Sequence, residues 1–174
     1  MKVLYIRGME LQQAHQEFIQ LWGNFGSQWG INRTMAQVHA LLLTSEDALS
    51  TDEIMEQLSI SRGGANSNLR ELMVWNLIYK TSFPGDRKEF FVAEKDMWEV
   101  AKRITRERKR REIEPLMHHL VRLKTIDEKN VAADNFKGIV TDIERLVGRM
   151  DKASETLMKM EENAFFGSFL RLLK

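Results

Sequence analysis

Residues 50–75 read STDEIMEQLSISRGGANSNLRELMVW, and this stretch decides the fold. Ser50 followed by Glu53 forms a capping-box pattern, which favours the start of a short helix at this point. After a very short connection, Ser61 is a suitable N-cap for a second helix that we expect to run to about Trp75. Two short helices joined by so tight a turn are typical of a helix-turn-helix.

The second helix of this motif is predicted to have one apolar face and one small, polar face. At about 100° per residue, the apolar side chains gather on one side, which we expect to be buried. The opposite side carries small polar residues instead of the Glu and Lys that an ordinary solvent-facing helix would present. Its residues are Gly63, Asn66, Ser67 and Arg70, with Arg62 near the N-terminal edge and Ser61 at the cap.

The chemistry of this outer face suits the major groove of duplex DNA. Arg70 can bind guanine with two hydrogen bonds, and Asn66 can bind adenine in the same way. Ser67 can contact a base or a phosphate, and the free amides at the helix N-terminus can bind a phosphate. Gly63 and the glycine after it each destabilise a helix by roughly 1 kcal/mol relative to Ala. Such residues are expected where the backbone approaches another molecule closely, so we predict that this face contacts DNA.

A β-hairpin is predicted directly after the helix-turn-helix. Residues 77–82 and 89–93 are strand-like, and residues 83–88 between them contain the turn-forming residues Pro, Gly and Asp. Arg87 and Lys88 lie at the expected tip, where an Arg can enter the minor groove of DNA. A solvated tip is the alternative. A helix-turn-helix followed at once by a two-stranded wing is more specific than either element alone.

Apolar stripes on the flanking helices predict a homodimer. Residues 10–29 form an expected helix, with Leu11, Phe18 and Phe25 among its apolar positions. The C-terminal part has apolar residues at alternating steps of three and four, a heptad pattern that favours packing along a partner helix. The apolar segment 165–173 is also expected to dock on the partner chain. The heptad positions are Phe136, Ile139, Ile143, Leu146, Met150, Ala153, Leu157, Met160 and Ala164.

The predicted fold is mainly α (α+β), a winged helix-turn-helix domain with N- and C-terminal dimerisation helices. We expect a dimerisation helix in residues 1–29, the DNA-binding domain in residues 30–95 and a helical dimerisation region in residues 96–174. Two recognition helices in such a dimer would enter successive major grooves of double-stranded DNA at a pseudo-palindromic operator.

The distribution of charge agrees with a polyanionic partner. The net charge of the chain is only +1, but residues 61–111 contain thirteen Lys or Arg and seven Asp or Glu. This basic middle suggests contact with nucleic acid. Within it, the basic run 102–111 could follow the DNA backbone or pair with acidic residues of the partner subunit. A polar helix that bridges two lobes is the simpler interpretation of this run.

The composition disfavours several other classes of protein. The chain has no Cys, which removes disulfides, thiolate metal sites and Cys nucleophiles. It has no long apolar run and no secretory signal, so we expect a cytoplasmic protein without membrane association. His118 stands four residues after Glu114, but without a third ligand we expect no metal. No motif for an enzyme or for a cofactor is found.

Several stretches resemble the GbsR group of MarR-like winged-helix transcriptional regulators. The resemblance includes SRGGANSNLRELMVWNLI at 61–78, PGDRKEFF at 84–91 and RERKRREI at 106–113, the last preceded by a D-x-W at 96–98. The upstream WGINRTMAQVHALLL also resembles the second helix of the family, so the coverage extends from about residue 18 to 126. One departure is Ser59, where such motifs often carry Gly in the turn.

This resemblance implies a dimeric repressor that binds DNA through the 61–75 helix and the wing. Some members of the group sense choline or related osmolytes, and a quaternary ammonium ligand needs an aromatic cage. The four Trp residues are nevertheless expected in the core or at an interface, so the effector stays unknown.

The main alternative is a winged-helix module that binds protein, although such a surface should have more exposed apolar anchors. RNA binding is disfavoured because the wing tip lacks stacking aromatics. The four Trp residues mentioned above in connection with an effector are Trp22, Trp29, Trp75 and Trp98.

Overall fold

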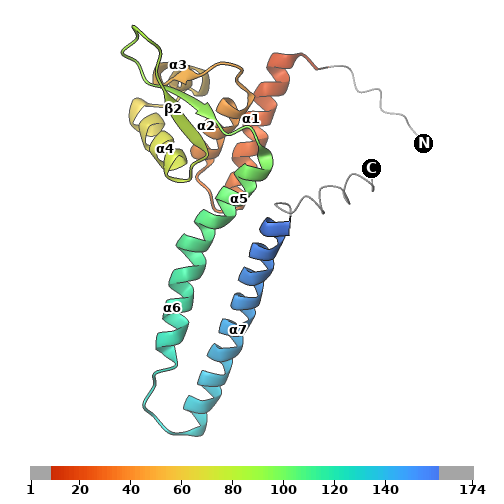
Figure 1. Ribbon diagram of the computed structural model, residues 1–174, viewed down its shortest axis with the longest axis vertical. Helices are drawn as coiled ribbons and strands as arrows, with labels where there is room; N and C mark the ends of the chain where they lie inside the picture. Colours follow the sequence, from red (N-terminus) through yellow and green to blue (C-terminus); the bar gives the residue numbers. More distant parts are fainter. Residues whose placement is uncertain (1–8, 161–174) are drawn as a thin grey trace, which may run out of the picture. The chain divides into compact units, whose positions relative to one another are not determined.

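The computed structural model of the chain describes residues 9–160, and Figure 1 labels the helices and strands in chain order. The chain divides into two compact units between Val100 and Ala101. Among the described residues, no helix is both long and apolar enough to cross a membrane.

Four helices of the first unit confirm the sequence prediction to within one or two residues. The predicted N-terminal helix is α1 (Leu11–Gln28), and the following helix is α2 (Arg33–Thr44). The helix-turn-helix consists of α3 (Thr51–Leu58) and α4 (Arg62–Val74). The capping box at the start of α3 is present, with the Ser50 hydroxyl accepting from the Glu53 amide and the Glu53 carboxylate accepting from the Ser50 amide.

Helices α1 and α2 pack unusually closely because α1 has glycines on its buried face. A Cβ placed on Gly26 would lie only 2.6 Å from the Cβ of Ala36. A Cβ placed on Gly23 would likewise lie 2.6 Å from the Cγ of Gln37. Gly30 then ends the helix with a φ of +76°. The glycines that weaken this helix in isolation therefore allow the tight contact that holds it in the fold.

The core of the first unit lies between α2, α3, α4 and a small sheet. Fully buried side chains come from each helix of this group, and the apolar face predicted for α4 from helical spacing is confirmed. Lys95 supports this core from its edge by donating hydrogen bonds to the carbonyl oxygens of Leu42 (2.7 Å), Leu43 (2.8 Å) and Ser45 (2.8 Å). A lysine at this position satisfies carbonyls that the end of α2 leaves without partners.

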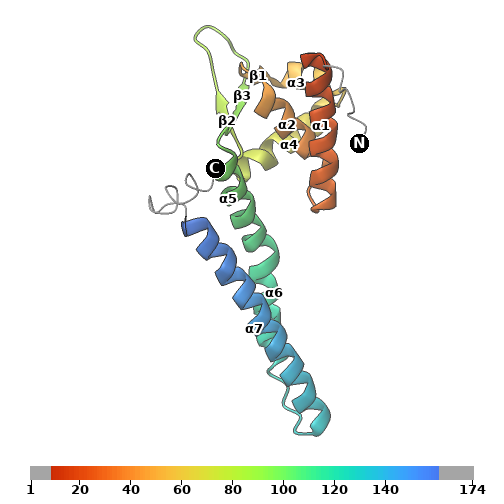
Figure 2. The ribbon, with the colours of Figure 1, turned by 90° about the vertical axis from the view of Figure 1, so that its right-hand side faces the viewer.

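The sheet contains the predicted hairpin and one short strand that the sequence did not predict. Strands β2 (Ile78–Thr81) and β3 (Phe90–Ala93) pair antiparallel, and β1 (Leu49–Ser50) adds to the other side of β3. Figure 2 shows the loop between β2 and β3 extending from the rest of the unit. Strand β1 has only two residues, too few for an alternating pattern.

The second unit is built mainly from two antiparallel helical segments. Helix α5 (Met97–Arg108) continues through a π-helical turn, η1 (Lys109–Ile113), into α6 (Glu114–Leu123). Helix α7 (Val131–Met160) then runs back alongside α6 (Figure 1). Pro115, which was expected to mark a helix boundary, lies in the first turn of α6 just after the π turn. Because proline removes an N–H and clashes with the carbonyl four residues earlier, a widened turn accommodates it without a break.

Candidate DNA-binding surface

Helix α4, the predicted recognition helix, is oriented by its buried face. Ala65, Leu69 and Leu72 are at most 1% exposed, and they fix this side of the helix in the core. The predicted DNA-contacting residues of α4 are all exposed on the other side, namely Arg62, Gly63, Asn66, Ser67 and Arg70, with Ser61 exposed at the cap. The structure therefore brings the predicted residues together on one outward face.

The start of α4 is held by three local interactions. The hydroxyl of Ser61 accepts a hydrogen bond from the Gly64 amide at 3.2 Å, which confirms this residue as the N-cap. Asn68 donates to the Gly64 carbonyl at 2.8 Å. Arg62 forms an ion pair with Asp52 in the first turn of α3, so its charge is partly compensated within the chain.

Arg70 is the side chain of α4 best placed to reach another molecule. It is exposed, and within the described part of the chain it has no hydrogen bond or ion pair. Asn66 and Ser67 are exposed beside it. Val74, one turn after Arg70, is 52% exposed on the same side, although the sequence analysis assigned it no role. Its spacing of four residues from Arg70 is the signal that could have identified it.

Ser59 adopts the left-handed conformation in the turn between α3 and α4, with φ of 52° and ψ of 44°. This is the position at which the sequence departs from the glycine common in such turns. The left-handed backbone conformation is one that glycine adopts easily and serine less readily. Ser59 nevertheless adopts it here.

The wing places Arg87 and Lys88 in an exposed loop between β2 and β3. Gly85 has a φ of +85°, and the Asp86 carboxylate accepts a hydrogen bond from the Lys88 amide at 2.9 Å. Asp86 thus serves the turn, as the sequence predicted. Nearer the strands, the rings of Phe83 and Phe90 meet edge to face at 4.9 Å and support the base of the loop.

The basic run 102–111 is largely compensated by acidic residues of its own chain. Glu107 is buried and forms ion pairs with Arg110 and Arg111. Hydrogen bonds from these two arginines lower the pKa of Glu107, and the bond from Arg110 has the larger effect. Lys109 pairs with Asp151 and Glu155 of α7, and these hydrogen bonds raise the pKa of its ammonium group. The structure therefore shows bonds within one subunit where the sequence left open pairing with a partner subunit or with DNA.

The predicted dimerisation stripe of α1 is exposed or half-exposed. Phe18, Trp22, Phe25 and Trp29 form a row of neighbouring rings along the helix, with centroids 5.3–5.9 Å apart. Leu11 is exposed at the start of the same helix. These rings lie in line along one helix instead of converging as a cage. Trp75 is buried in the core, whereas Trp29 and Trp98 are exposed, so for these two the interface position stays a prediction.

The predicted heptad seam lies on a side of α7 that residues 9–160 leave uncovered. A neighbouring side of α7 packs through buried Ala133 and Val140 and through the pair Lys124–Glu144. The structure does not describe the C-terminal part of the predicted seam. This part consists of the side chains of Leu157 and Met160, of Ala164 and of the segment 165–173. The exposed seam residues are Phe136, Ile139, Ile143, Leu146 and Met150.

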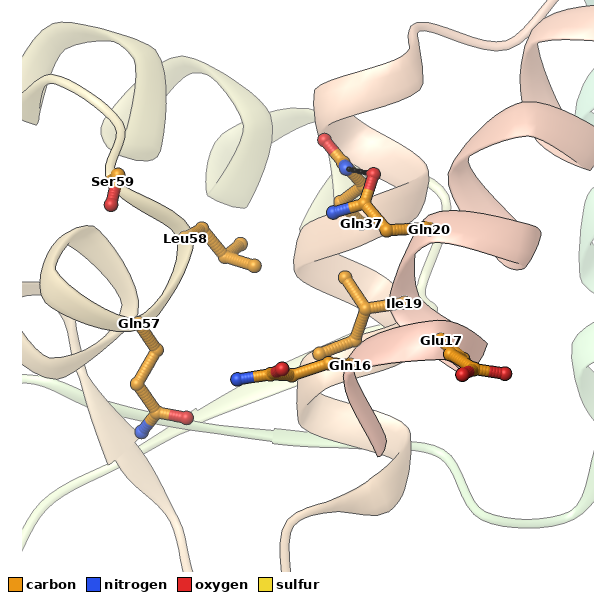
Figure 3. A pocket seen from close by; sticks show the side chains of 8 residues that line it. All are labelled: Gln16, Glu17, Ile19, Gln20, Gln37, Gln57, Leu58 and Ser59. Atoms are coloured by element: carbon orange, nitrogen blue, oxygen red, sulfur yellow. Dashed lines mark hydrogen bonds between the residues drawn. The ribbon is translucent and has the colours of Figure 1, made fainter. Parts of the chain in front are cut away.

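A polar pocket lies at the side of the first unit, next to the helix-turn-helix. It encloses about 620 Å³ between the N-terminal half of α1, α2 and the end of α3 (Figure 3). Across it, Gln16 of α1 and Gln57 of α3 face each other, and Ile19 and Leu58 supply apolar surface. No predicted DNA-contacting residue lines this pocket. Within residues 9–160, no cluster of three or more potential metal ligands is found.

His39 is a buried ionisable group that the sequence analysis did not assign to any site. Its Nδ1 accepts a hydrogen bond from the Trp22 indole at 3.4 Å, so the neutral ring carries its proton on Nε2. This Nε2 is buried and has no hydrogen-bond partner within residues 9–160. Burial, and secondarily the positive charge of Lys95, lower the pKa of His39 from 6.5 to about 4.

The fold and the exposed face of α4 define the class of protein that this chain resembles, a winged helix-turn-helix transcriptional regulator. A solved structure described as a transcriptional regulator shares the fold, with a TM-score of 0.67 at 17% identity. The match covers 86% of this chain and 98% of that one. MepR, a transcription regulator of the Staphylococcus aureus multidrug efflux pump MepA, gives a TM-score of 0.39 at 16% identity over 91% of this chain and 94% of its own. No family model matches the chain.

A curated relative is the HTH-type transcriptional repressor GbsR of Bacillus subtilis (strain 168). It is 28% identical over 88 residues, which are 51% of this chain and 48% of the relative. This chain therefore matches about half the length of that protein. The resemblance to GbsR-type, MarR-like regulators is confirmed, and these relatives are transcriptional regulators, not enzymes.

Proposed function

We propose that this chain is a repressor that binds a specific double-stranded DNA site as a homodimer. The observation that carries the proposal is the outward face of α4, where small residues flank an exposed Arg70 that has no partner within the described residues. The guanidinium of Arg70 stands on a helix that is anchored by its other, buried face, and it has no ion-pair partner among the described residues. Such a group suits bidentate recognition of guanine in the major groove. Asn66 and Ser67 add hydrogen-bonding groups on the same face.

The wing and the helix N-terminus would supply contacts to the DNA backbone or the minor groove. Arg87 and Lys88 are exposed in the loop between β2 and β3, which Asp86 and Gly85 shape. Ser61 and Arg62 stand at the N-terminus of α4, where backbone amides favour a phosphate. Because Arg62 is paired with Asp52, we expect it to contribute less to DNA affinity than Arg70.

The homodimer is supported by the apolar surface that the described part of the chain leaves exposed. The uncovered side of α7 carries five large apolar residues in heptad register, and α1 adds a row of aromatic rings. A contiguous apolar face of this kind marks an interaction surface, and its heptad spacing suits another helix with the same spacing. A second copy of the chain offers such a helix.

The first test is selection of bound fragments from genomic DNA of the source organism at near-physiological salt. The proposal predicts a few sites with inverted-repeat symmetry. Recovery of random fragments, with binding that disappears as salt rises, would instead show non-specific attraction to phosphates and would contradict specific recognition.

Two substitutions then separate the roles of the helix and the wing. Arg70→Ala is expected to relax sequence preference at one position of each half-site, with a loss of about 1–3 kcal/mol in discrimination. Arg87→Ala is expected to weaken binding to all sequences and to flatten its salt dependence. Arg149→Ala, an exposed arginine on α7, is the matched control and should leave both properties unchanged. Wild-type binding by both test variants would show that these assignments are wrong.

A small-molecule effector, which the family resemblance implies, would find polar contacts in the pocket of Figure 3. The pocket touches both α1 and Ser59 of the turn that positions α4. A ligand there would contact a helix of the proposed dimer interface and the DNA-binding motif together. Its amide-rich wall suits a small polar molecule. Gln57→Leu should abolish a ligand-dependent change in DNA affinity without changing the affinity measured in the absence of ligand.

A further inference from the structure

We infer that Val74 reads the methyl group of a thymine, as a specificity-determining residue of the proposed DNA site. The inference rests on the DNA-binding function proposed above and adds a base contact to it. Val74 is the last residue of α4 and is 52% exposed. The other large aliphatic residues of this helix, Leu69 and Leu72, are each 1% exposed.

The position of Val74 on the helix places it in line with the predicted base contacts. With 3.6 residues per turn, Gly63, Ser67, Arg70 and Val74 fall within an arc of about 60° on one side of α4. The buried residues lie on the other side, so this arc points away from the core. Val74 therefore extends the strip of exposed residues that begins at Gly63 and passes through Arg70.

The chemistry of Val74 differs from that of every other residue in this strip. Glycine, serine and arginine offer close approach or hydrogen bonds, whereas valine offers only two methyl groups. In the major groove, the apolar feature of a base edge is the C5-methyl group of thymine, and apolar side chains contact it. Without such a contact, Val74 would leave its methyl groups in water and would add nothing to binding.

The geometry of the helix also predicts which thymine is read. Four residues of an α-helix rise about 6 Å, and neighbouring base pairs are about 3.4 Å apart along each strand. A helix lying along the groove would therefore place Val74 about two base pairs from the guanine bound by Arg70. The same separation should recur in both half-sites of the operator.

The test replaces each thymine of a selected operator in turn by uracil, which removes only the C5-methyl group. We expect the wild-type chain to lose about fourfold in affinity at one thymine per half-site, the effect of exposing one methyl group. For Val74→Ala, uracil and thymine at this position should bind equally, while the effect of changing the Arg70 guanine should stay as in wild type. Val131→Ala, at an exposed valine of α7, is the matched control and should keep the wild-type response to uracil.

The outcomes separate this inference from the proposed function. If an operator is bound in an Arg70-dependent manner but Val74→Ala keeps the full response to uracil at every thymine, the thymine contact is wrong and the DNA-binding proposal stands. If no specific operator is bound at all, both are overturned. Thermal unfolding of Val74→Ala should match wild type because the side chain is exposed, and it shows that any loss arises at the DNA contact.

Discussion

The two units of the chain use their apolar side chains in opposite ways. Among the described residues, seventeen apolar residues are buried in the first unit and only three, Leu120, Ala133 and Val140, in the second. The second unit instead exposes the large apolar residues along its longest helix. The first unit therefore contains the core that its fold requires, whereas the second leaves apolar surface for the partner subunit of the proposed dimer to cover.

The polar interactions of the two units also differ, because those of the first unit support its core and those of the second join exposed helices. In the first unit, Lys95 and the capping box bind backbone groups at helix ends. In the second, Lys109 and Lys124 join α7 to η1 and to the end of α6 through ion pairs with partly exposed carboxylates. Such pairs typically contribute about 0–1 kcal/mol each, so they align the helices but cannot replace a core.

The largest effect is expected at the exposed seam of the second unit. Leu146→Lys would put a charge from each subunit into the apolar interface, and we expect dimerisation to weaken by about 100-fold or more. Sedimentation equilibrium measures the change. Far-UV circular dichroism of the resulting monomer should show lost helix from the second unit while the first unit unfolds as before.

The matched control for the seam is Thr156→Lys, which adds the same charge to the same helix away from the seam. It should leave the dimer intact. A Leu146→Lys chain that remains dimeric, or a monomer whose second unit keeps all its helix, would break the proposed contrast between the two units.

A large effect specific to the first unit is expected on acidification. The pKa of His39 is about 4 in the fold and 6.5 in the unfolded chain, so the unfolded state binds more protons between these values. The free energy of unfolding should therefore fall as the pH drops from 6.5 towards 4, by about 3 kcal/mol in total. Below this window, and above it, His39 contributes no further slope.

Urea unfolding at a series of pH values measures this loss for wild type and for His39→Gln, which has no titrating ring. The variant should be less stable at neutral pH but should lack this part of the pH dependence. Equal slopes for the two proteins would contradict the assignment to His39.

The sequence predicted the first unit well because its signals are local. The capping box at Ser50 and the N-cap at Ser61 each depend on residues a few positions apart, and each is present in the structure. The hairpin followed from turn residues between two strand-like segments. The outward face of α4 followed from helical spacing alone.

What the sequence could not predict depends on residues far apart in the chain. Lys95 binds carbonyls about fifty residues earlier, and β1 exists only because it pairs with β3. The environment of His39 is set by Trp22 in another helix. Gly23 and Gly26 look like helix-weakening residues until the close approach of α2 gives them a packing role. No local pattern carries this information.

A moderate effect is expected from overpacking the first unit at Gly26. In Gly26→Ala, the added methyl group would lie 2.6 Å from the Cβ of Ala36, so the two helices must separate. We expect a loss of about 2 kcal/mol in the free energy of unfolding, measured by urea denaturation. Gly138→Ala is the counterpart in the second unit, where the added group meets nothing within 4 Å. It should instead stabilise α7 by up to about 1 kcal/mol. Destabilisation by both would show that the second unit is as tightly packed as the first.

The smallest change in stability is expected at Gly63. At this position we also expect stability and DNA affinity to change in opposite directions. A Cβ at this position meets nothing within 4 Å in the described chain, and alanine favours a helix, so Gly63→Ala should stabilise the first unit by about 1 kcal/mol. The same methyl group would stand between α4 and DNA on the strip that contains Arg70. If the backbone approaches DNA here, operator affinity should fall by about tenfold or more, equivalent to about 1.4 kcal/mol. Urea denaturation and operator titration on the same preparation measure both effects. Higher stability with unchanged DNA affinity would mean that no close backbone contact occurs at this glycine, and the recognition surface would then begin further along α4, towards Asn66.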